Sequence, residues 1–231
     1  MELDRCITSL GIKFLKWPNN FFTESDAHSF LYYYIFRSSI PELKRFYHTA
    51  DNKSKTVLVH REYPTSYRYI KENMELSDRG GRGHYDLVIL NPEFITTHSI
   101  EEVMAKTYKK VSKNDKEHLL TVIEFKLVVN ALSKRMKEEI EKDVKKLNYA
   151  LDLVQSKTAY MIVFNRYRKE ELYQQEIATL GKAYSKIKFI YIESVPENKR
   201  HYYWLYINNW RYIMKTKKVK YKHIRNNDNY A

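Results

Sequence analysis

Two charged residues, Glu124 and Lys126, interrupt the largely apolar stretch 119–129. If this stretch is a β-strand, its side chains alternate between faces, so both residues point the same way and lie roughly 6–7 Å apart. Charges in such a strand are costly to bury unless they are paired or bind an ion. An acid two residues before a lysine occurs five times in the chain, but only this pair interrupts an apolar strand. The context therefore favours a functional pair over a structural buried ion pair.

Asp86 has the same character, because it lies in the apolar stretch 85–90, which predicts a second strand. If the two strands pair, the carboxylates of Asp86 and Glu124 can share one divalent cation. Hard oxygen ligands suit Mg²⁺, with Mn²⁺ as a possible substitute. Lys126 would then orient or deprotonate a water on that cation, or stabilise the charge that develops on a phosphoryl group. These three residues form the predicted active site.

The elements that must position these residues alternate between helix and strand. A capping box at Thr23 and Asp26 predicts a helix at 24–37, and a β-branched run predicts a strand at 56–60 that Pro64 ends. The elements expected after the strands at 85–90 and 119–129 are a long amphipathic helix at 132–154, a strand at 159–164, a helix at 170–184 and a strand at 187–192. This order, αβββαβ plus an additional αβ, predicts a three-layer α/β fold with a central mixed β-sheet flanked by helices.

The chain resembles the PD-(D/E)XK nuclease superfamily, which includes restriction and repair endonucleases. The resemblance covers roughly residues 22–165 and rests on Glu24 in the first predicted helix, Asp86 after a glycine-rich segment, and Ile-Glu-Phe-Lys-Leu at 123–127. It implies a restriction-endonuclease-like core and Mg²⁺-dependent hydrolysis of phosphodiester bonds, with DNA preferred to RNA. By position, Glu24 is similar to the family's helix acid, which helps to hold a metal or its water. Because many such enzymes pair to cut both strands, the resemblance also allows a homodimer.

The chain departs from the family pattern in two places. The proline that the family has before its first aspartate is absent, since His84 and Tyr85 stand before Asp86. The gap from Asp86 to Glu124 is long, and a capping box at Ser99 predicts an inserted helix within it, at 99–110. We expect this insertion to contribute to substrate recognition.

Three of the five glycines lie at positions 80, 81 and 83, just before Asp86. In a chain this poor in glycine, the cluster indicates a need for backbone freedom or close approach. Arg79, Arg82 and His84 flank these glycines and are candidates for gripping the scissile phosphate. An equally good interpretation is a mobile hairpin connection with no ligand.

Glu62 and His28 have weaker claims to the site. Glu62, at the end of the first predicted strand, is a possible auxiliary acid that replaces or assists Glu24, although a salt bridge at the strand end is favoured. His28 lies four residues after Glu24 on the same helix face. A packing histidine with satisfied hydrogen bonds is favoured there over a metal ligand.

The polar face of the long helix carries Lys142, Lys145, Lys146 and Asp143. A solvated face is the favoured interpretation of the lysines, with contact to a DNA backbone as the alternative. Asp143 belongs to the same face and is assigned no role.

The segment 199–225 contains nine Lys and Arg residues and no acid, with aromatic residues interleaved. Basic side chains can neutralise phosphates and aromatic faces can stack on unpaired bases, so Lys217, Lys218 and Lys220 are candidate nucleic-acid contacts. A lysine-rich solvated face over a partly buried aromatic strand is an equally good reading. We expect one nuclease-like domain over residues 1–198, with 199–231 as an extension packed on it or continuing it.

Composition narrows the class of protein. The excess of 41 Lys and Arg over 28 Asp and Glu, a net charge of +13, suits a nucleic-acid partner. A single cysteine excludes a disulfide framework within the chain and fits a reducing, cytoplasmic setting. No apolar run is long enough to span a membrane, and the N-terminus lacks the apolar core of a secretory signal. No Gly-x-x-x-x-Gly-Lys loop occurs, so NTP hydrolysis is not expected.

These observations favour a metal-dependent nuclease, expected to be a DNA endonuclease. The first alternative is a catalytically inactive nucleic-acid-binding module on the same fold. The second is a scaffold protein whose basic tail contacts an acidic partner. The intact set Asp86, Glu124 and Lys126 favours the enzyme.

Overall fold

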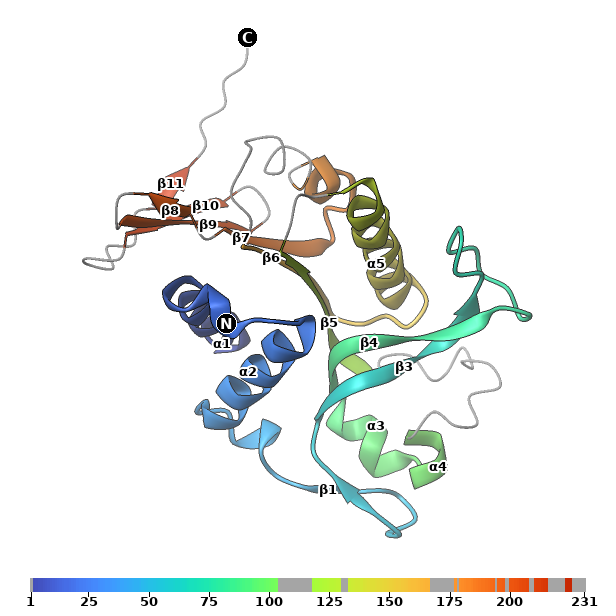
Figure 1. The fold of residues 1–231 in the computed structure, drawn as a ribbon. Coiled ribbons are helices and arrows are strands. Elements are labelled where there is room, and N and C mark those ends of the chain that lie inside the picture. Colours follow the sequence, from blue (N-terminus) through green and yellow to red (C-terminus); the bar gives the residue numbers. More distant parts are fainter. Residues whose placement is uncertain are drawn as a thin grey trace.

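A five-stranded mixed sheet forms the centre of the computed structural model, with strand order β3-β4-β5-β6-β7 (Figure 1). The strands are β3 (Val59–Tyr69), β4 (Gly81–Leu90), β5 (Leu119–Val128), β6 (Thr158–Asn165) and β7 (Ile187–Glu193). The pairs β3–β4 and β4–β5 are antiparallel, whereas β5–β6 and β6–β7 are parallel. The strand that carries Glu124 and Lys126 is therefore the middle one, as its apolar sequence predicts.

The structure describes part of the chain in full and a further part as backbone only. Residues 3–103, 118–129, 133–166, 177 and 179–193 belong to the first group, and the backbone alone is described for residue 2 and for 195–197, 200–207, 210–215 and 223–225.

Helices cover both faces of the sheet (Figure 1). Helices α1 (Glu2–Lys16) and α2 (Glu24–Arg37) lie on one face, and α5 (Lys134–Asp152) lies on the other. This confirms the predicted α/β class with a mixed sheet between helices. No element was predicted for α1, although apolar residues recur along it at helical spacing. Within the described residues, no helix has the length and apolar character that crossing a membrane requires.

Local signals set several of these elements correctly. Helix α2 has the predicted bounds, and the Asp26 carboxylate accepts a hydrogen bond from the Thr23 N–H at 2.8 Å, as a capping box requires. Ser99 likewise precedes α4 (Ile100–Val103), and its N–H donates to the Glu102 carboxylate at 2.7 Å. The rest of the predicted insertion, after Val103, lies outside the described residues.

The first strand was predicted wrongly at both ends. Strand β3 begins at Val59 and continues through Pro64 to Tyr69. Pro64 is tolerated because β3 is an edge strand, where a missing N–H breaks no inner ladder, and the register shifts after it.

Two of the three glycines before Asp86, Gly80 and Gly83, serve close approach and not backbone freedom. All five glycines of the chain are described, and none has a positive φ. A Cβ atom at Gly80 would collide with the backbone of Tyr69, and one at Gly83 would collide with the Tyr69 phenol ring. β4 begins at Gly81, so part of the segment interpreted as a loop is strand.

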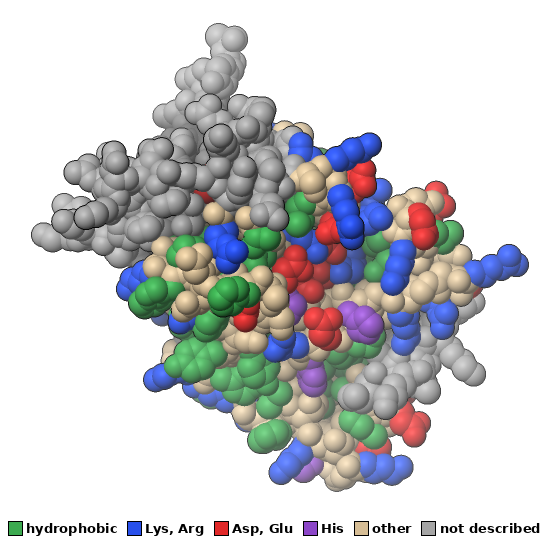
Figure 2. Space-filling view, viewed as in Figure 1, with side chains coloured by type: hydrophobic (Ala, Val, Ile, Leu, Met, Phe, Trp, Pro, Cys, Tyr) green, Lys and Arg blue, Asp and Glu red, His purple; other side chains and the backbone are tan. Residues whose placement is uncertain are grey.

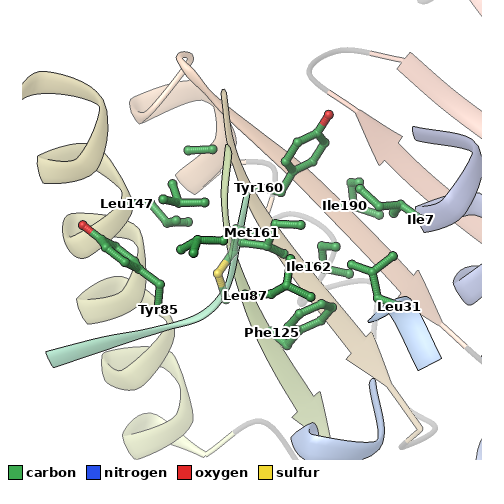
Figure 3. Packing of buried hydrophobic residues seen from close by; sticks show 14 of the residues in the cluster. Ile7, Leu31, Tyr85, Leu87, Phe125, Leu147, Tyr160, Met161, Ile162 and Ile190 are labelled. Carbon is green, nitrogen blue, oxygen red and sulfur yellow. The ribbon is translucent and has the colours of Figure 1, made fainter. Parts of the chain in front are cut away.

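The hydrophobic core lies on both sides of the sheet (Figure 3). Ile7, Leu31 and Ile190 pack where α1 and α2 meet the sheet. Tyr85 of β4 and Leu147 of α5 pack on the opposite side. Each such side chain stabilises the fold by about 1.5–3 kcal/mol on burial. Strand β5 packs between these two layers, and this packing fixes the positions of its charged residues.

Shorter elements surround this core. They are η1 (Pro18–Asn20), η2 (Pro41–Leu43), α3 (Pro92–Thr97), and a two-stranded sheet of β1 (Tyr47–His48) and β2 (Lys55–Thr56). A separate antiparallel sheet contains β8 (Val195–Glu197), β9 (Arg200–Ile207), β10 (Trp210–Lys215) and β11 (His223–Arg225). The backbone of β9 lies against β7.

Candidate functional site

The site lies where β4 and β5 separate. Their ladder pairs Leu90 with Leu119 at one end and Leu87 with Ile123 at the other, so the two strands do pair as the site requires. Beyond that point carboxylates take over the N–H groups along this edge of β5. The Asp86 Oδ2 accepts from the N–H of Phe125 at 2.7 Å.

Glu24 continues the same arrangement one step along β5. Its Oε1 accepts from the N–H of Leu127 at 3.4 Å. Helix α2 thus delivers a carboxylate to the strand edge, next to that of Asp86. The backbone of β5 has N–H donors there that β4 does not use. Glu24, the predicted helix acid, accepts from one of them and therefore lies next to the other site residues.

Glu124 is the most buried acid of the site. Its side chain is 1% exposed, and its Oε2 lies 2.8 Å from the Lys146 ammonium. Its Oε1 has no hydrogen-bond partner among the described residues. Burial raises the pKa of Glu124 well above its ordinary value, against the opposing effect of Lys146.

Lys126 lies between carboxylates from both sides of the sheet. Its Nζ is 2.9 Å from Asp143 Oδ2 on α5 and 3.5 Å from Glu24 Oε2 on α2. Burial acts to lower the pKa of Lys126, but the carboxylates of Asp143 and Glu24 outweigh it and hold the pKa above its ordinary value. The side chain is therefore an ammonium at neutral pH.

The expectation that α5 presents only a solvated face here is wrong for Lys146 and Asp143. Lys146 is buried, and its Nζ contacts Asp143 Oδ1 at 3.2 Å and donates to the carbonyl oxygen of His84 at 2.8 Å. Burial acts to lower the pKa of Lys146, but Glu124 and Asp143 outweigh it and raise the pKa. A usable signal existed: the two residues are three apart and border the apolar stripe at Val144.

His28, Glu62 and Asp86 form a second cluster next to the first. His28 Nε2 is 3.6 Å from Asp86 Oδ2, and His28 Nδ1 is 3.8 Å from Glu62 Oε1. Burial acts to raise the pKa of Asp86, but His28, the Phe125 N–H and Lys146 together outweigh it and lower the pKa. The His28 ring packs on Phe125 with centroids 4.9 Å apart, as a packing histidine would. Yet neither ring nitrogen has a hydrogen-bond partner among the described residues.

Glu62 occupies an unusual backbone conformation. It lies inside β3 with φ of 50°, a left-handed conformation that side chains other than glycine seldom adopt. Such strain is found mostly where it aims a functional group. The salt bridge predicted for Glu62 is a 3.8 Å contact with His28.

We predict that Glu62→Gly is more stable than Glu62→Ala by about 1 kcal/mol, because only glycine relieves the left-handed strain. In an ordinary strand the order is reversed, since glycine costs roughly 0.5–1 kcal/mol relative to alanine. Denaturant unfolding of both variants measures the difference. Arg61→Gly and Arg61→Ala, at the preceding exposed position, are the matched control and should show the ordinary order. If the Glu62 pair follows the same order as the Arg61 pair, the backbone at Glu62 is unstrained.

The candidate phosphate contacts before Asp86 are placed on its strand or just before it. Arg82 and His84 lie in β4 at alternate positions to Asp86 and so face the same side, while Arg79 lies in the preceding turn. Their role remains a prediction. Lys217, Lys218 and Lys220 lie outside the described residues.

An open hollow of about 240 Å³ lies beside the two lysines of the site. Its lining consists of Tyr69, Lys71, Met74, Lys126, Glu139, Lys142, Asp143 and Lys146. In the space-filling view, acidic and histidine side chains gather near the centre of the face, with Lys and Arg side chains around them (Figure 2). The hollow gives a ligand access to Lys126, and its cationic residues suit an anionic one.

Comparison with known proteins adds no relative. No family model, curated protein or solved structure matches this chain. The site itself contains three carboxylates at a strand edge, one buried and one half-buried ammonium group, and an adjoining hollow with cationic side chains.

Proposed function

We propose that this protein is a metal-dependent nuclease that hydrolyses phosphodiester bonds, with DNA as the favoured substrate. The observation that carries the proposal is the convergence of Asp86, Glu124 and Lys126 where β4 and β5 separate, beside a hollow with cationic side chains. The order α2, β3, β4, β5, α5, β6 supports it once the short helices α3 and α4 between β4 and β5 are set aside, because it then follows the αβββαβ core of the PD-(D/E)XK nucleases that the motif resembles.

The residues present fit a divalent cation. Glu124 Oε1 is a buried oxygen without a described hydrogen-bond partner, and Asp86 is held at the same strand junction. Carboxylate oxygens are the ligands that Mg²⁺ and Mn²⁺ prefer. When bound there, such a cation would supply a Lewis acid for a phosphoryl oxygen and favour hydroxide over water as nucleophile.

The chain's own cations supply the rest of the electrostatics. Lys126 stays protonated beside Asp143 and Glu24, so it is suited to stabilise negative charge on the phosphoryl group and not to remove a proton. Of the roles considered for Lys126, this supports charge stabilisation over deprotonation of a water. Lys146 offsets the charge of the buried Glu124 and so keeps that carboxylate in place.

The inactive binding module is the second candidate, and one contact favours it. Lys146 already neutralises Glu124 at 2.8 Å, so the site is charge-compensated without any cation. If that ion pair does not yield to a metal, the same surface binds nucleic acid without cutting it.

The deciding experiment incubates the full chain with plasmid, linear and branched DNA and with single-stranded RNA, in Mg²⁺, Mn²⁺ or EDTA. We expect cutting with a divalent cation and none in EDTA. Lys126→Ala should lower the rate by roughly 10²–10³-fold, as loss of a charge-stabilising donor does elsewhere. Lys134→Ala, which removes an exposed lysine from α5, is the matched control and should cut at the wild-type rate.

The outcomes separate the candidates. Nucleic-acid binding that weakens with salt, without cutting in any metal, makes the binding module the better account. Cutting that survives Lys126→Ala within a few fold places the active site elsewhere. No binding at low salt removes both candidates and favours the scaffold protein.

A further inference from the structure

A histidine and two acids from three different elements meet beside the proposed active site. His28 comes from α2, Glu62 from β3 and Asp86 from β4, and one donor atom of each lies within 4.8 Å of the others. His28 is brought there by the same face of α2 that delivers Glu24, four residues earlier. Only Asp86 is shared with the pair proposed to bind the catalytic cation.

The imidazole of His28 is buried and unsatisfied. Its side chain is 4% exposed, and neither nitrogen has a hydrogen-bond partner in the described part of the chain. Leaving a buried polar group unpaired costs about 1–3 kcal/mol. The nearest acids, at 3.6 and 3.8 Å, are too far for hydrogen bonds. These two distances involve opposite ring nitrogens, and a shared ion would take only one of them. One donor atom from each of the three residues lies within 4.8 Å of the other two, so small side-chain rotations bring all three to the roughly 3–4 Å spacing of ligands around one cation.

The backbone conformation of Glu62 also supports a cation shared by these three side chains. Its φ of 50° stores strain in the middle of a strand, and its side chain reaches His28. Strain of this kind typically costs of order 1–3 kcal/mol and persists where the surrounding structure needs the group in that place. Two independent costs, at His28 and at Glu62, thus converge on one point next to Asp86.

We propose that His28, Glu62 and Asp86 form a second cation site that selects Mn²⁺, or a similar transition-metal ion, over Mg²⁺. Mg²⁺ takes oxygen ligands in near-octahedral geometry, whereas imidazole nitrogen suits transition metals. Asp86 connects this site to the one proposed with Glu124. The role of the second cation in hydrolysis rests on the proposed function, but the site itself is tested by binding alone.

The test titrates Mn²⁺ and Mg²⁺ into the metal-free full chain by calorimetry. We expect wild type to bind Mn²⁺ at least about tenfold more tightly than Mg²⁺. His28→Asn keeps a polar side chain of similar size without the nitrogen ligand. Loss of an outer-shell partner costs roughly 10–100-fold in metal affinity, so His28→Asn should weaken Mn²⁺ binding by at least that factor. It should weaken Mg²⁺ binding by less than about threefold. His60→Asn is the matched control, since His60 is a half-buried histidine on strand β3 that bonds to the Val57 carbonyl oxygen.

A spectroscopic readout keeps the proposal testable if His28→Asn does not fold. Electron spin echo of Mn²⁺ bound to wild type should show coupling to a ¹⁴N nucleus, which His60→Asn retains and Glu62→Gln retains at lower Mn²⁺ occupancy. Absence of ¹⁴N coupling, or equal affinities for the two metals, overturns the proposal, as does unchanged Mn²⁺ binding by folded His28→Asn. Selective Mn²⁺ binding without cleavage of any nucleic acid refutes the proposed function and leaves the cation site standing. Cleavage of nucleic acid with unselective metal binding supports the proposed function and overturns the second cation site.

Discussion

Asp86→Asn is expected to lower nucleic-acid hydrolysis by on the order of 10³-fold or more while the fold stays intact. A cation acting as Lewis acid lowers the activation barrier by several kcal/mol, and each 1.4 kcal/mol is about tenfold in rate. Asp86 belongs to both proposed cation sets, so its charge matters more than that of any other acid in the site. The amide oxygen of asparagine can still accept the hydrogen bond from the Phe125 N–H, now 2.7 Å from Asp86 Oδ2.

Three measurements on this variant separate a catalytic role from a structural one. Cleavage rate should collapse, calorimetric binding of Mg²⁺ and Mn²⁺ should weaken, and denaturant unfolding should change by less than about 1 kcal/mol. Asp152→Asn, which removes a surface acid paired with Lys186, is the control and should leave rate and metal binding unchanged. A folded Asp86→Asn protein that cuts within tenfold of wild type would exclude Asp86 from the active site.

Lys146→Met is expected to lower the free energy of unfolding by about 3–5 kcal/mol, the cost of breaking a buried ion pair from one side. Glu124 would then be buried in an apolar strand without the ammonium now 2.8 Å from its Oε2. The double variant Lys146→Met/Glu124→Gln removes both charges and should recover most of this loss. Denaturant unfolding of the single and double variants measures the coupling. If the double variant is no more stable than Lys146→Met, the pair is not what the lysine stabilises.

The same variant predicts the sign of a pH dependence. Burial raises the pKa of Glu124 even with Lys146 present, and removing the lysine raises it further. Between the ordinary pKa of glutamate and the raised one, the folded state holds a proton that the unfolded state has released. Stability therefore falls as pH rises through this window. Lys146→Met should be more destabilising at about pH 8 than at about pH 5, and the double variant should lose this difference.

Periodicity and caps were enough to predict α2, α5 and β5, although they missed α1 and misplaced both ends of β3. The capping box at Thr23 set the start of α2, and the apolar repeat through Val144 and Leu147 set α5. The apolar run of β5 correctly indicated a middle strand, because only a strand covered on both faces has so few polar positions. These signals are local, so a single sequence contains them.

The charged pair in β5 and Asp86 in β4 were predictable for the same reason. A charge in an apolar strand conflicts with its surroundings, and the conflict is visible in the sequence. Pro64 misled because its meaning depends on whether its strand lies at an edge, and the sequence does not show strand order.

Only the tertiary structure decided the partners of these residues. Lys146 and Asp143 read as ordinary surface charges on α5, and they became site residues because α5 packs over the end of β5. His28 and Glu62 are 34 positions apart in the sequence, and no local pattern links them. Their meeting with Asp86 depends on how α2 crosses the sheet and on one strained residue in β3. The sequence thus determined which charges conflict with their strands, and long-range packing determined which charges resolve that conflict, because pairing energies depend on distances that only the folded chain sets.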